Sequence, residues 1–216
     1  MAHRAPALAR ERAAWSAGRI LVGLDEVGRG PLAGPVVAAA IAFAPDARRI
    51  NGVRDSKVLS ARTRERLAER IRERALCLGI GAASTREIDR YNIRRATALA
   101  LRRAFDALDP PPGDRPLTIL LDGLPLAEFG MPHEALVDGD ALCYSVAAAG
   151  IVAKTVRDRL MMSLGARHTG YGWDHNMGYG TSDHLAALRA LGPTRHHRSS
   201  FAPVSQLTFT FTGEDA

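Results

Sequence analysis

Three acidic residues directly follow apolar strands, where an ionised carboxylate is costly unless a cation or a hydrogen-bond donor compensates its charge, and a fourth lies within reach of them. Asp25 and Glu26 follow directly on the apolar run 20–24, and Asp122 follows directly on the apolar run 117–121. Asp140 comes 18 residues after Asp122, just ahead of a long helical pattern. Hard oxygen ligands without histidine or cysteine favour Mg²⁺ or Mn²⁺ over zinc. The four carboxylates therefore predict a divalent-metal site, and a pair of such ions is suited to in-line attack on a phosphodiester.

Each acid taken singly also has a plainer explanation. Acidic residues at strand ends are ordinary turn formers, and Asp140 could simply cap a helix. Asp25 and Glu26 are adjacent, and adjacent residues of a strand point to opposite faces. We therefore expect Asp25 and Glu26 to share a metal site only if the strand ends or bulges at that point.

The elements that would position these acids alternate between strands and helices. We predict strands at 20–24, 36–43, 77–83 and 117–121, with a weaker one near 135–137. This pattern indicates a three-layer α/β domain with a sheet of about five strands flanked by helices. If strands 20–24 and 117–121 are parallel neighbours, the acids that follow them meet at one edge of the sheet, where function collects in α/β folds.

The helices are recognised by their caps and their apolar periodicity. We predict helices at 60–75, 93–108, 145–164 and 181–191. A capping box that begins at Ser84 predicts one further, short helix. The inner face of helix 145–164 is expected to carry Val146, Ala149, Val152, Ala153, Val156 and Leu160. Residues 1–18 are rich in alanine and arginine, and we expect them to form a mobile or loosely docked segment.

Composition narrows the choice of partner and compartment. The formal net charge of +6 favours a polyanionic partner. No apolar run approaches the roughly 20 residues that a membrane-spanning helix needs. The two cysteines indicate neither a disulfide framework nor a zinc site. We therefore expect a cytoplasmic protein that does not span a membrane.

A glycine-rich turn follows the first two acids. Gly28, Arg29 and Gly30 open it, and a strand rather than a helix follows, so the spacing fits neither a dinucleotide-binding loop nor a P-loop. Main-chain groups at glycine can approach a sugar closely because no side chain intervenes, and the guanidinium can bind phosphate.

Further motifs occur in order along residues 20–204. They are GLDEVGRGPLAGPV at 23–36, DSK at 55–57, EID at 87–89, LDG at 121–123, GD at 139–140, SVAAA at 145–149, GYGT at 178–181 and HR at 197–198. In these motifs the sequence resembles prokaryotic type 2 ribonuclease H, the ribonuclease HII family. Its type 3 counterpart has a different glycine segment and an extra N-terminal domain.

The resemblance implies an RNase H-like fold, with a five-stranded mixed sheet flanked by helices and a small C-terminal helical region. It divides the chain into an N-terminal extension at 1–18, a catalytic domain at 19–165 and a C-terminal helical substrate-binding region and tail at 166–216. The implied activity is endonucleolytic cleavage of the RNA strand in RNA–DNA hybrids, and cleavage on the 5′ side of single ribonucleotides embedded in duplex DNA during their removal. The ends left are 3′-hydroxyl and 5′-phosphate.

The resemblance also assigns roles to particular residues. The four acids become catalytic metal ligands for Mg²⁺ or Mn²⁺: Asp25, Glu26, Asp122 and Asp140. The main chain at Gly28, Arg29 and Gly30 reads the ribose 2′-hydroxyl, and Tyr179 packs on the sugar of the next deoxynucleotide. The only two lysines, Lys57 and Lys154, are expected to contact substrate phosphates, although each could equally be a solvated surface lysine.

Two positions depart from the family pattern. Asp138 stands where the family usually has lysine, which puts an anion beside the site, and Gly150 stands where serine is usual in the helix. Two alternative functions stay open: a nucleic-acid-binding module without turnover, and a metal-dependent DNA nuclease that does not require a 2′-hydroxyl. We expect a monomer, and the segment Gln206-Leu207-x-x-Thr210-Phe211 is loosely similar to a peptide that binds a sliding clamp.

Overall fold

A single five-stranded mixed sheet forms the centre of the computed structural model, which describes residues 5–109 and 111–211, with only the backbone of residues 208–211. The strands are β1 (Ile20–Val27), β2 (Val36–Ala42), β3 (Cys77–Ala83), β4 (Leu117–Asp122) and β5 (Glu134–Leu136). They lie in the order β3-β2-β1-β4-β5. β1 pairs antiparallel with β2 but parallel with β4, and β5 continues the parallel side. All five predicted strands are therefore confirmed.

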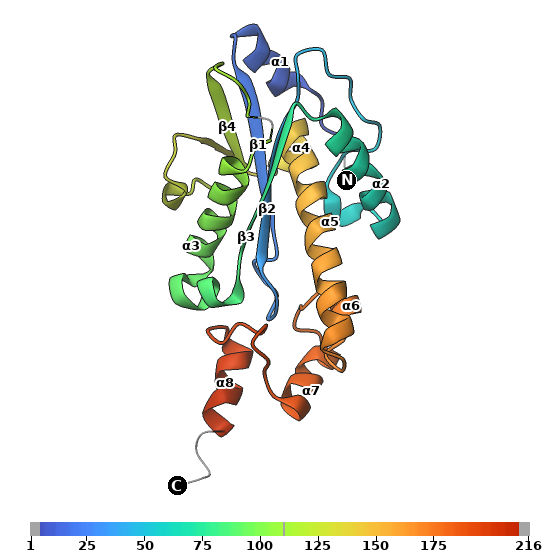
Figure 1. The fold of residues 1–216 in the computed structure, drawn as a ribbon, viewed down its shortest axis with the longest axis vertical. Coiled ribbons are helices and arrows are strands. Elements are labelled where there is room, and N and C mark those ends of the chain that lie inside the picture. The colour runs from blue at the N-terminus through green and yellow to red at the C-terminus, as the bar shows by residue number, and fades with distance from the viewer. Residues whose placement is uncertain (1–4, 110, 212–216) are drawn as a thin grey trace.

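Helices cover both faces of this sheet (Figure 1). On one face α3 (Thr85–Asp106) packs over β2 and β3. On the other face α5 (Tyr144–Arg167) crosses β1 and β2, and α2 (Ala61–Arg74) packs against α5. The short α4 (Gly139–Leu142) leads into α5. This confirms the predicted three-layer α/β architecture.

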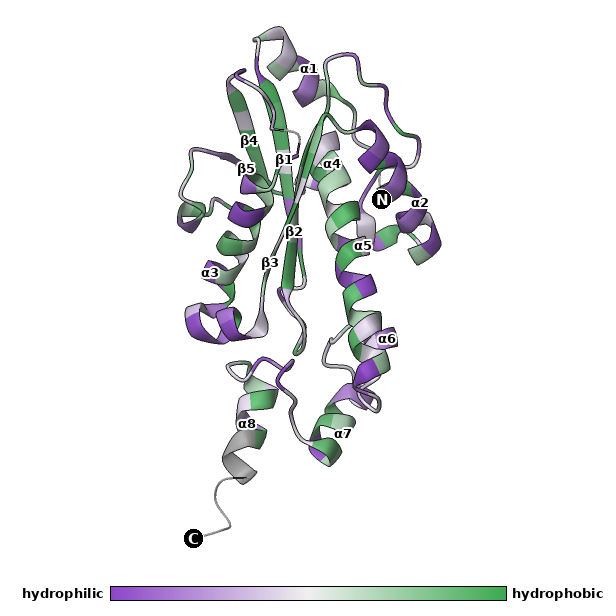
Figure 2. Ribbon diagram, viewed as in Figure 1, coloured by the Kyte–Doolittle hydropathy of each residue, from purple (hydrophilic) through white to green (hydrophobic). Residues whose placement is uncertain are grey.

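The remaining helices lie at the two ends of the sheet. Near one end is α1 (Ala9–Ser16), and beyond the other are α6 (Trp173–Asn176), α7 (Ser182–Leu191) and α8 (Ala202–Phe211) (Figure 1). Figure 2 shows that the strands are mostly hydrophobic, whereas α2 is mostly hydrophilic. No helix in the described ranges is both long and apolar enough to cross a membrane.

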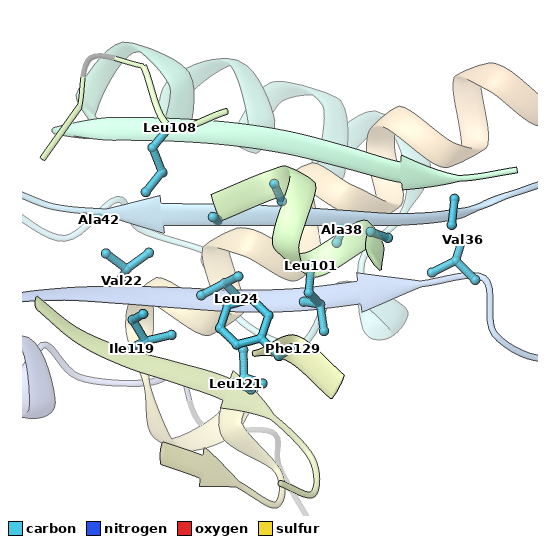
Figure 3. Close-up of a cluster of buried hydrophobic side chains, with 14 of the residues drawn as sticks. Val22, Leu24, Val36, Ala38, Ala42, Leu101, Leu108, Ile119, Leu121 and Phe129 are labelled. Atoms are coloured by element: carbon cyan, nitrogen blue, oxygen red, sulfur yellow. The ribbon is translucent and has the colours of Figure 1, made fainter. Parts of the chain in front are cut away.

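The core between the sheet and α3 shows which residues of β1 point to each face. Val22 and Leu24 lie in this cluster with Leu101 of α3 and Leu121 of β4 (Figure 3). Since neighbouring strand residues alternate, the intervening Gly23 faces α5. A Cβ atom at Gly23 would lie only 2.5 Å from the backbone nitrogen of Val146, so the absent side chain lets α5 approach the sheet closely.

One expectation about the helices is wrong. Leu160 is 38% exposed, and Met161 is buried in its place, because α5 continues past the edge of the sheet and turns its inner stripe toward the C-terminal region. Helix α3 covers both helical segments expected between Ser84 and Leu108 and is kinked where they meet: Asn92 has a φ of 67°, and its side chain accepts hydrogen bonds from the N–H groups of Arg94 and Arg95.

The expectation of a loosely docked N-terminal segment is wrong for its described helical part. Glu11 of α1 is fully buried, and its Oε1 accepts hydrogen bonds from the backbone N–H of Ser145 at 2.7 Å and from the Ser145 hydroxyl at 2.9 Å. Leu8 and Ala14 are buried beside it. The carboxylate thus caps the N-terminus of α5 from a distant part of the chain, where the helix dipole favours a negative charge.

Candidate active site

The pairing of β1 with β4 brings two of the acids side by side. The strands are parallel and Leu24 pairs with Leu121, so Asp25 and Asp122 follow at the same level. Leu24 and Leu121 face α3, and both aspartates therefore face α5. The N–H of Gly139 donates a hydrogen bond of 2.7 Å to Oδ1 of Asp122, which ties the strand to the turn that precedes α4.

Glu26 reaches the same region from the opposite face of the sheet. β1 continues to Val27 in unbroken pairing with β2, so the expected strand end or bulge between Asp25 and Glu26 is absent. Both residues nevertheless line one pocket of about 300 Å³ at the carboxyl end of β1. Glu26 manages this because its longer side chain lies at the rim of the sheet, where Arg29 pairs with it at 3.2 Å.

That pocket collects nearly every residue singled out in the sequence. Its lining consists of Asp25, Glu26, Val27, Gly28, Arg29, Gly30, Ser56, Lys57, Asp122, Lys154 and Tyr179. Asp140 does not line it, but lies near enough on α4 to act on the charge of Asp25. The acids come from three elements that are far apart in the sequence, and only the parallel sheet brings them together.

The acidic cluster carries more negative charge than its surroundings neutralise. Burial raises the pKa of Asp25 well above its ordinary value, and the neighbouring charges of Glu26, Asp122 and Asp140 raise it further. Burial also raises the pKa of Glu26, although Arg29 opposes this. The pKa of Asp140 is raised by burial and then by Asp122. A carboxylate cluster of this kind, without histidine or cysteine, is the donor set that Mg²⁺ or Mn²⁺ takes.

The side chains do not yet stand in a ligand arrangement. Across residues 5–109 and 111–211, no three His, Cys, Asp or Glu side chains are placed so that they could hold a metal ion. The position of Asp25 contributes to this. Its Oδ1 accepts the N–H of Glu26 at 2.7 Å, and its Oδ2 lies where a Cβ atom of residue 150 would be, only 2.2 Å from that ideal position. The carboxylate of Asp25 thus rests against α5 in the space that Gly150 leaves.

Both lysines lie at the acidic pocket but are held differently. Lys57 is exposed to solvent. Partial desolvation of its amine lowers the pKa, but the nearby charges of Asp25, Asp55 and Asp140 have the larger combined effect, so the pKa is raised. Lys154 donates to Asp158, which also accepts from Arg64 at 2.8 Å. Lys57 is therefore the cation available to a substrate phosphate, whereas Lys154 must exchange its partner to make such a contact.

The glycine loop, residues 28–35, forms another wall of the pocket. Gly28 has a φ of +96°, which side chains rarely adopt, and a Cβ there would meet the Arg157 guanidinium at 2.1 Å. A Cβ at Gly30 would lie 3.8 Å from the ring of Tyr179, so the tyrosine stands beside the loop. Tyr179 is 45% exposed, and its backbone carbonyl accepts the ring Nδ1–H of His184 at 2.8 Å.

Sequence reasoning did not foresee how three residues shape the site. Arg157 and Arg198 are buried behind the glycine loop, and Gly150 makes room for Asp25. A signal existed for Arg157, because it lies on the same helical stripe as Ala153 and Met161, where a charge is unexpected. The departure at Asp138 also has a local reason: its φ of 56° is left-handed, a conformation that aspartate tolerates better than most residues.

Comparison with known proteins decides the family. The family model described as Ribonuclease HII matches residues 22–204. The chain belongs to the ribonuclease HII family. A ribonuclease HII of Synechococcus sp. (strain JA-3-3Ab) is 51% identical over 94% of this chain and 90% of its own.

Solved structures agree on the fold. The ribonuclease H2 of Pyrococcus horikoshii OT3 matches with a TM-score of 0.73 at 22% identity, covering 90% of this chain and 100% of that one. The ribonuclease HII of Archaeoglobus fulgidus, solved as a complex with PCNA, matches with a TM-score of 0.67 at 25% identity, over 83% of this chain and 92% of that one. The protein therefore has the predicted RNase H-like fold and is a metal-dependent ribonuclease H.

Proposed function

We propose that this ribonuclease H cleaves duplex DNA on the 5′ side of a single embedded ribonucleotide, as well as the RNA strand of RNA–DNA hybrids, and leaves 3′-hydroxyl and 5′-phosphate ends. One observation carries the proposal. The pocket that gathers Asp25, Glu26 and Asp122 is also walled by the main chain of the glycine loop and by Tyr179. Phosphodiester chemistry and recognition of a single sugar can therefore take place in one site.

In this proposal Asp25, Glu26, Asp122 and Asp140 would hold Mg²⁺ or Mn²⁺, with Asp25 contributing to both of two ions. Such ions, when bound, supply a nucleophilic water at neutral pH and neutralise charge on the leaving oxygen. The donor chemistry fits them, because the buried acids are not neutralised by the cations around them. Asp25 has to leave its position against Gly150 to join the other ligands.

The sugar is read by groups that do not depend on base identity. Only the 2′-hydroxyl distinguishes a ribonucleotide from a deoxyribonucleotide at one position. The main chain of Gly28, Arg29 and Gly30 forms part of the pocket wall and can offer N–H groups there, and neither glycine has a side chain that would block the approach of a sugar. Tyr179 presents an exposed ring beside Gly30, suited to packing on the next deoxyribose whatever base it carries.

The duplex backbone is held by cations around this pocket. Lys57 and Arg29 are exposed at the rim, and Lys154 lies within it. The net charge of +6 adds a general attraction to the phosphates. We place the activity in the cytoplasm, where the chromosome of a prokaryotic cell lies, and assign it to a monomer.

A clamp interaction belongs to this proposal as a secondary element. The ribonuclease HII of Archaeoglobus fulgidus was solved in complex with PCNA. The loosely clamp-like segment of this chain lies in α8, where Gln206 and Leu207 are described but the side chains of Thr210 and Phe211 lie outside the described residues.

The test is cleavage of a DNA duplex with one ribonucleotide by the wild type and by Asp25→Asn and Asp122→Asn. Both variants are nearly isosteric and remove a charge from a repulsive cluster, so they should fold at least as stably as the wild type. We expect each to lose at least a hundredfold in kcat/KM in the presence of Mg²⁺. Wild-type turnover by either variant would refute the assignment of the acids.

A further inference from the structure

Two arginines lie fully buried behind the glycine loop. Arg157 and Arg198 have 0% exposure. No carboxylate lies within salt-bridge distance of either one in the described part of the chain. A guanidinium removed from water in this way is costly unless acceptors satisfy its donors. Burial and, to a smaller extent, the charge of Arg157 lower the pKa of Arg198 to about 9.

The acceptors of Arg198 are main-chain carbonyls of the glycine loop. Its Nη1 donates to the carbonyl of Arg29 at 2.8 Å, and its Nη2 donates to the carbonyl of Gly28. The Nε and Nη2 groups both reach the carbonyl of Gly34, at 3.0 and 2.8 Å. One side chain thus spans the two ends of the loop, and the ring of Phe201 stacks on its guanidinium at 5.0 Å.

Arg157 holds the second half of the loop. It donates to the carbonyl of Pro35 at 3.0 Å and to that of Ala33 at 3.1 Å. Its third contact is the carbonyl of Met177, also at 3.0 Å, which lies two residues before Tyr179. The glycine loop and the segment that carries the tyrosine are therefore tied to the same guanidinium.

The contacts of Arg198 have a consequence for the pocket because a peptide unit is planar and trans. In such a unit the C=O and the following N–H point in opposite directions. With the carbonyls of Gly28 and Arg29 directed at Arg198, the N–H groups of Arg29 and Gly30 point away from it. Neither N–H has an acceptor among the residues that the structure describes. Gly28, Arg29 and Gly30 line the pocket, whereas Arg198 does not.

The segment that carries Arg198 is itself firmly anchored. The backbone N–H of Arg198 donates to the carbonyl of Leu32 at 2.8 Å. The next two residues, Ser199 and Ser200, donate both their N–H groups and their hydroxyls to the carboxylate of Asp89 at 2.6–3.0 Å. Arg198 is therefore a fixed support for the loop and not a mobile side chain.

We propose that Arg198 is a positioning residue that determines specificity for the 2′-hydroxyl, because it sets the peptide planes whose N–H groups face the bound sugar. Arg157 supports the second half of the loop and the approach to Tyr179. The inference rests on the proposed function, in which the main chain of residues 28–30 reads the sugar. It assigns neither arginine a contact with the substrate.

The test is Arg198→Lys, which keeps the charge but cannot reach three carbonyls at once. Two duplexes are compared, one with a single ribonucleotide and one with a 2′-fluoro-2′-deoxynucleotide at the same position. We expect kcat/KM for the ribonucleotide duplex to fall at least tenfold and the ratio between the two substrates to shrink at least tenfold. The Kd for an all-DNA duplex should stay within twofold of the wild-type value.

Arg103→Lys is the matched control. Arg103 also donates to a main-chain carbonyl, that of Ala82 at 2.7 Å, and pairs with Glu87, but it touches neither the loop nor the pocket. This variant should lose stability without changing the substrate ratio. If Arg198→Lys fails to fold, Phe201→Leu tests the same residue, because it removes the ring that stacks on the Arg198 guanidinium; the expected loss in the ratio is then about threefold.

The backbone amide signals of Arg29 and Gly30 in ¹H–¹⁵N spectra give a measurement that needs no turnover. They should be single and sharp in the wild type, and broadened or split in Arg198→Lys. An unchanged substrate ratio together with unchanged amide signals would overturn the inference. If the wild type itself fails to cleave the ribonucleotide duplex, the proposed function fails, and the amide signals still report whether Arg198 orders the loop.

Discussion

Replacing Gly150 by alanine should separate the stability of the protein from its activity. Glycine inside a helix costs about 1 kcal/mol relative to alanine. In a protein of this size, a gain of about 1 kcal/mol raises Tm by roughly 2–4 °C. Gly150 is buried and lies in the interior of α5, and its position inside the helix is the reason why alanine should stabilise the helix. The added Cβ atom, however, would lie 2.2 Å from Oδ2 of Asp25.

The effect on the metal site follows from this overlap. A carbon atom and an oxygen atom in contact are about 3.3 Å apart, so the carboxylate has to move by about 1 Å. Asp25 has to leave this position in any case to join the other ligands, and the serine that is usual at position 150 in the family also carries a Cβ atom. We therefore expect Gly150→Ala to keep kcat/KM on a single-ribonucleotide duplex within about threefold of the wild-type value, while Tm stays the same or rises. Isothermal titration with Mn²⁺ should show an equal or tighter Kd for the metal ion.

The control is Ser163→Ala, an exposed position of the same helix that does not contact Asp25. It should leave kcat/KM and the Kd for Mn²⁺ unchanged. A loss of about 10²-fold in kcat/KM, or a weaker Kd for Mn²⁺, in Gly150→Ala would show that metal binding depends on the space left by glycine, and the reasoning would be refuted.

Three further predictions use other parts of the molecule. Burial and the charge of His184 lower the pKa of His197 to about 4, so on acidification the unfolded chain takes up a proton at this histidine before the folded protein does. The free energy of unfolding measured with urea should therefore fall as the pH is lowered from 6.5 to 4, by up to about 3 kcal/mol. His197→Gln should remove this dependence on pH. Glu11→Ala leaves the donors of Ser145 without their acceptor and should cost about 2–4 kcal/mol in the same assay; a loss below about 0.5 kcal/mol would contradict the capping role. Tyr179→Ala should reduce the preference for the RNA–DNA junction in cleavage mapping, with an unchanged Kd for Mn²⁺; an unaltered junction preference would count against the packing of Tyr179 on the sugar.

The sheet and the region of the site could be predicted because their signals are local. The apolar runs of β1 and β4 end in acids, and the parallel pairing that joins Asp25 to Asp122 follows once those strands are neighbours. The family motifs supplied the rest of the pocket lining, including Lys57 and Tyr179. What the pattern did not reveal was how Glu26 joins Asp25, since β1 continues through both residues without a bulge.

The supporting contacts could not be predicted because they join distant residues through the backbone. Arg198 binds carbonyls more than 160 residues away. Every residue has a main-chain carbonyl, so the sequence does not indicate which of them an arginine will bind. Glu11 caps α5 from 134 residues away, and no local pattern in residues 1–18 indicates this contact. The position of Asp25 against Gly150 depends on the close packing of α5 on β1, and no local sequence pattern predicts how closely a helix packs on a strand.

The central claim is that one pocket combines carboxylates that bind divalent metal ions with a main chain that reads a single sugar. The most direct measurement is the mapping of cleavage products from a DNA duplex with one ribonucleotide, with and without Mg²⁺, beside the identical all-deoxy duplex. The account predicts a single cut on the 5′ side of the ribonucleotide, with 3′-hydroxyl and 5′-phosphate ends, only when Mg²⁺ is present. Equal cutting of the all-deoxy duplex, or cutting that persists in EDTA, would contradict it.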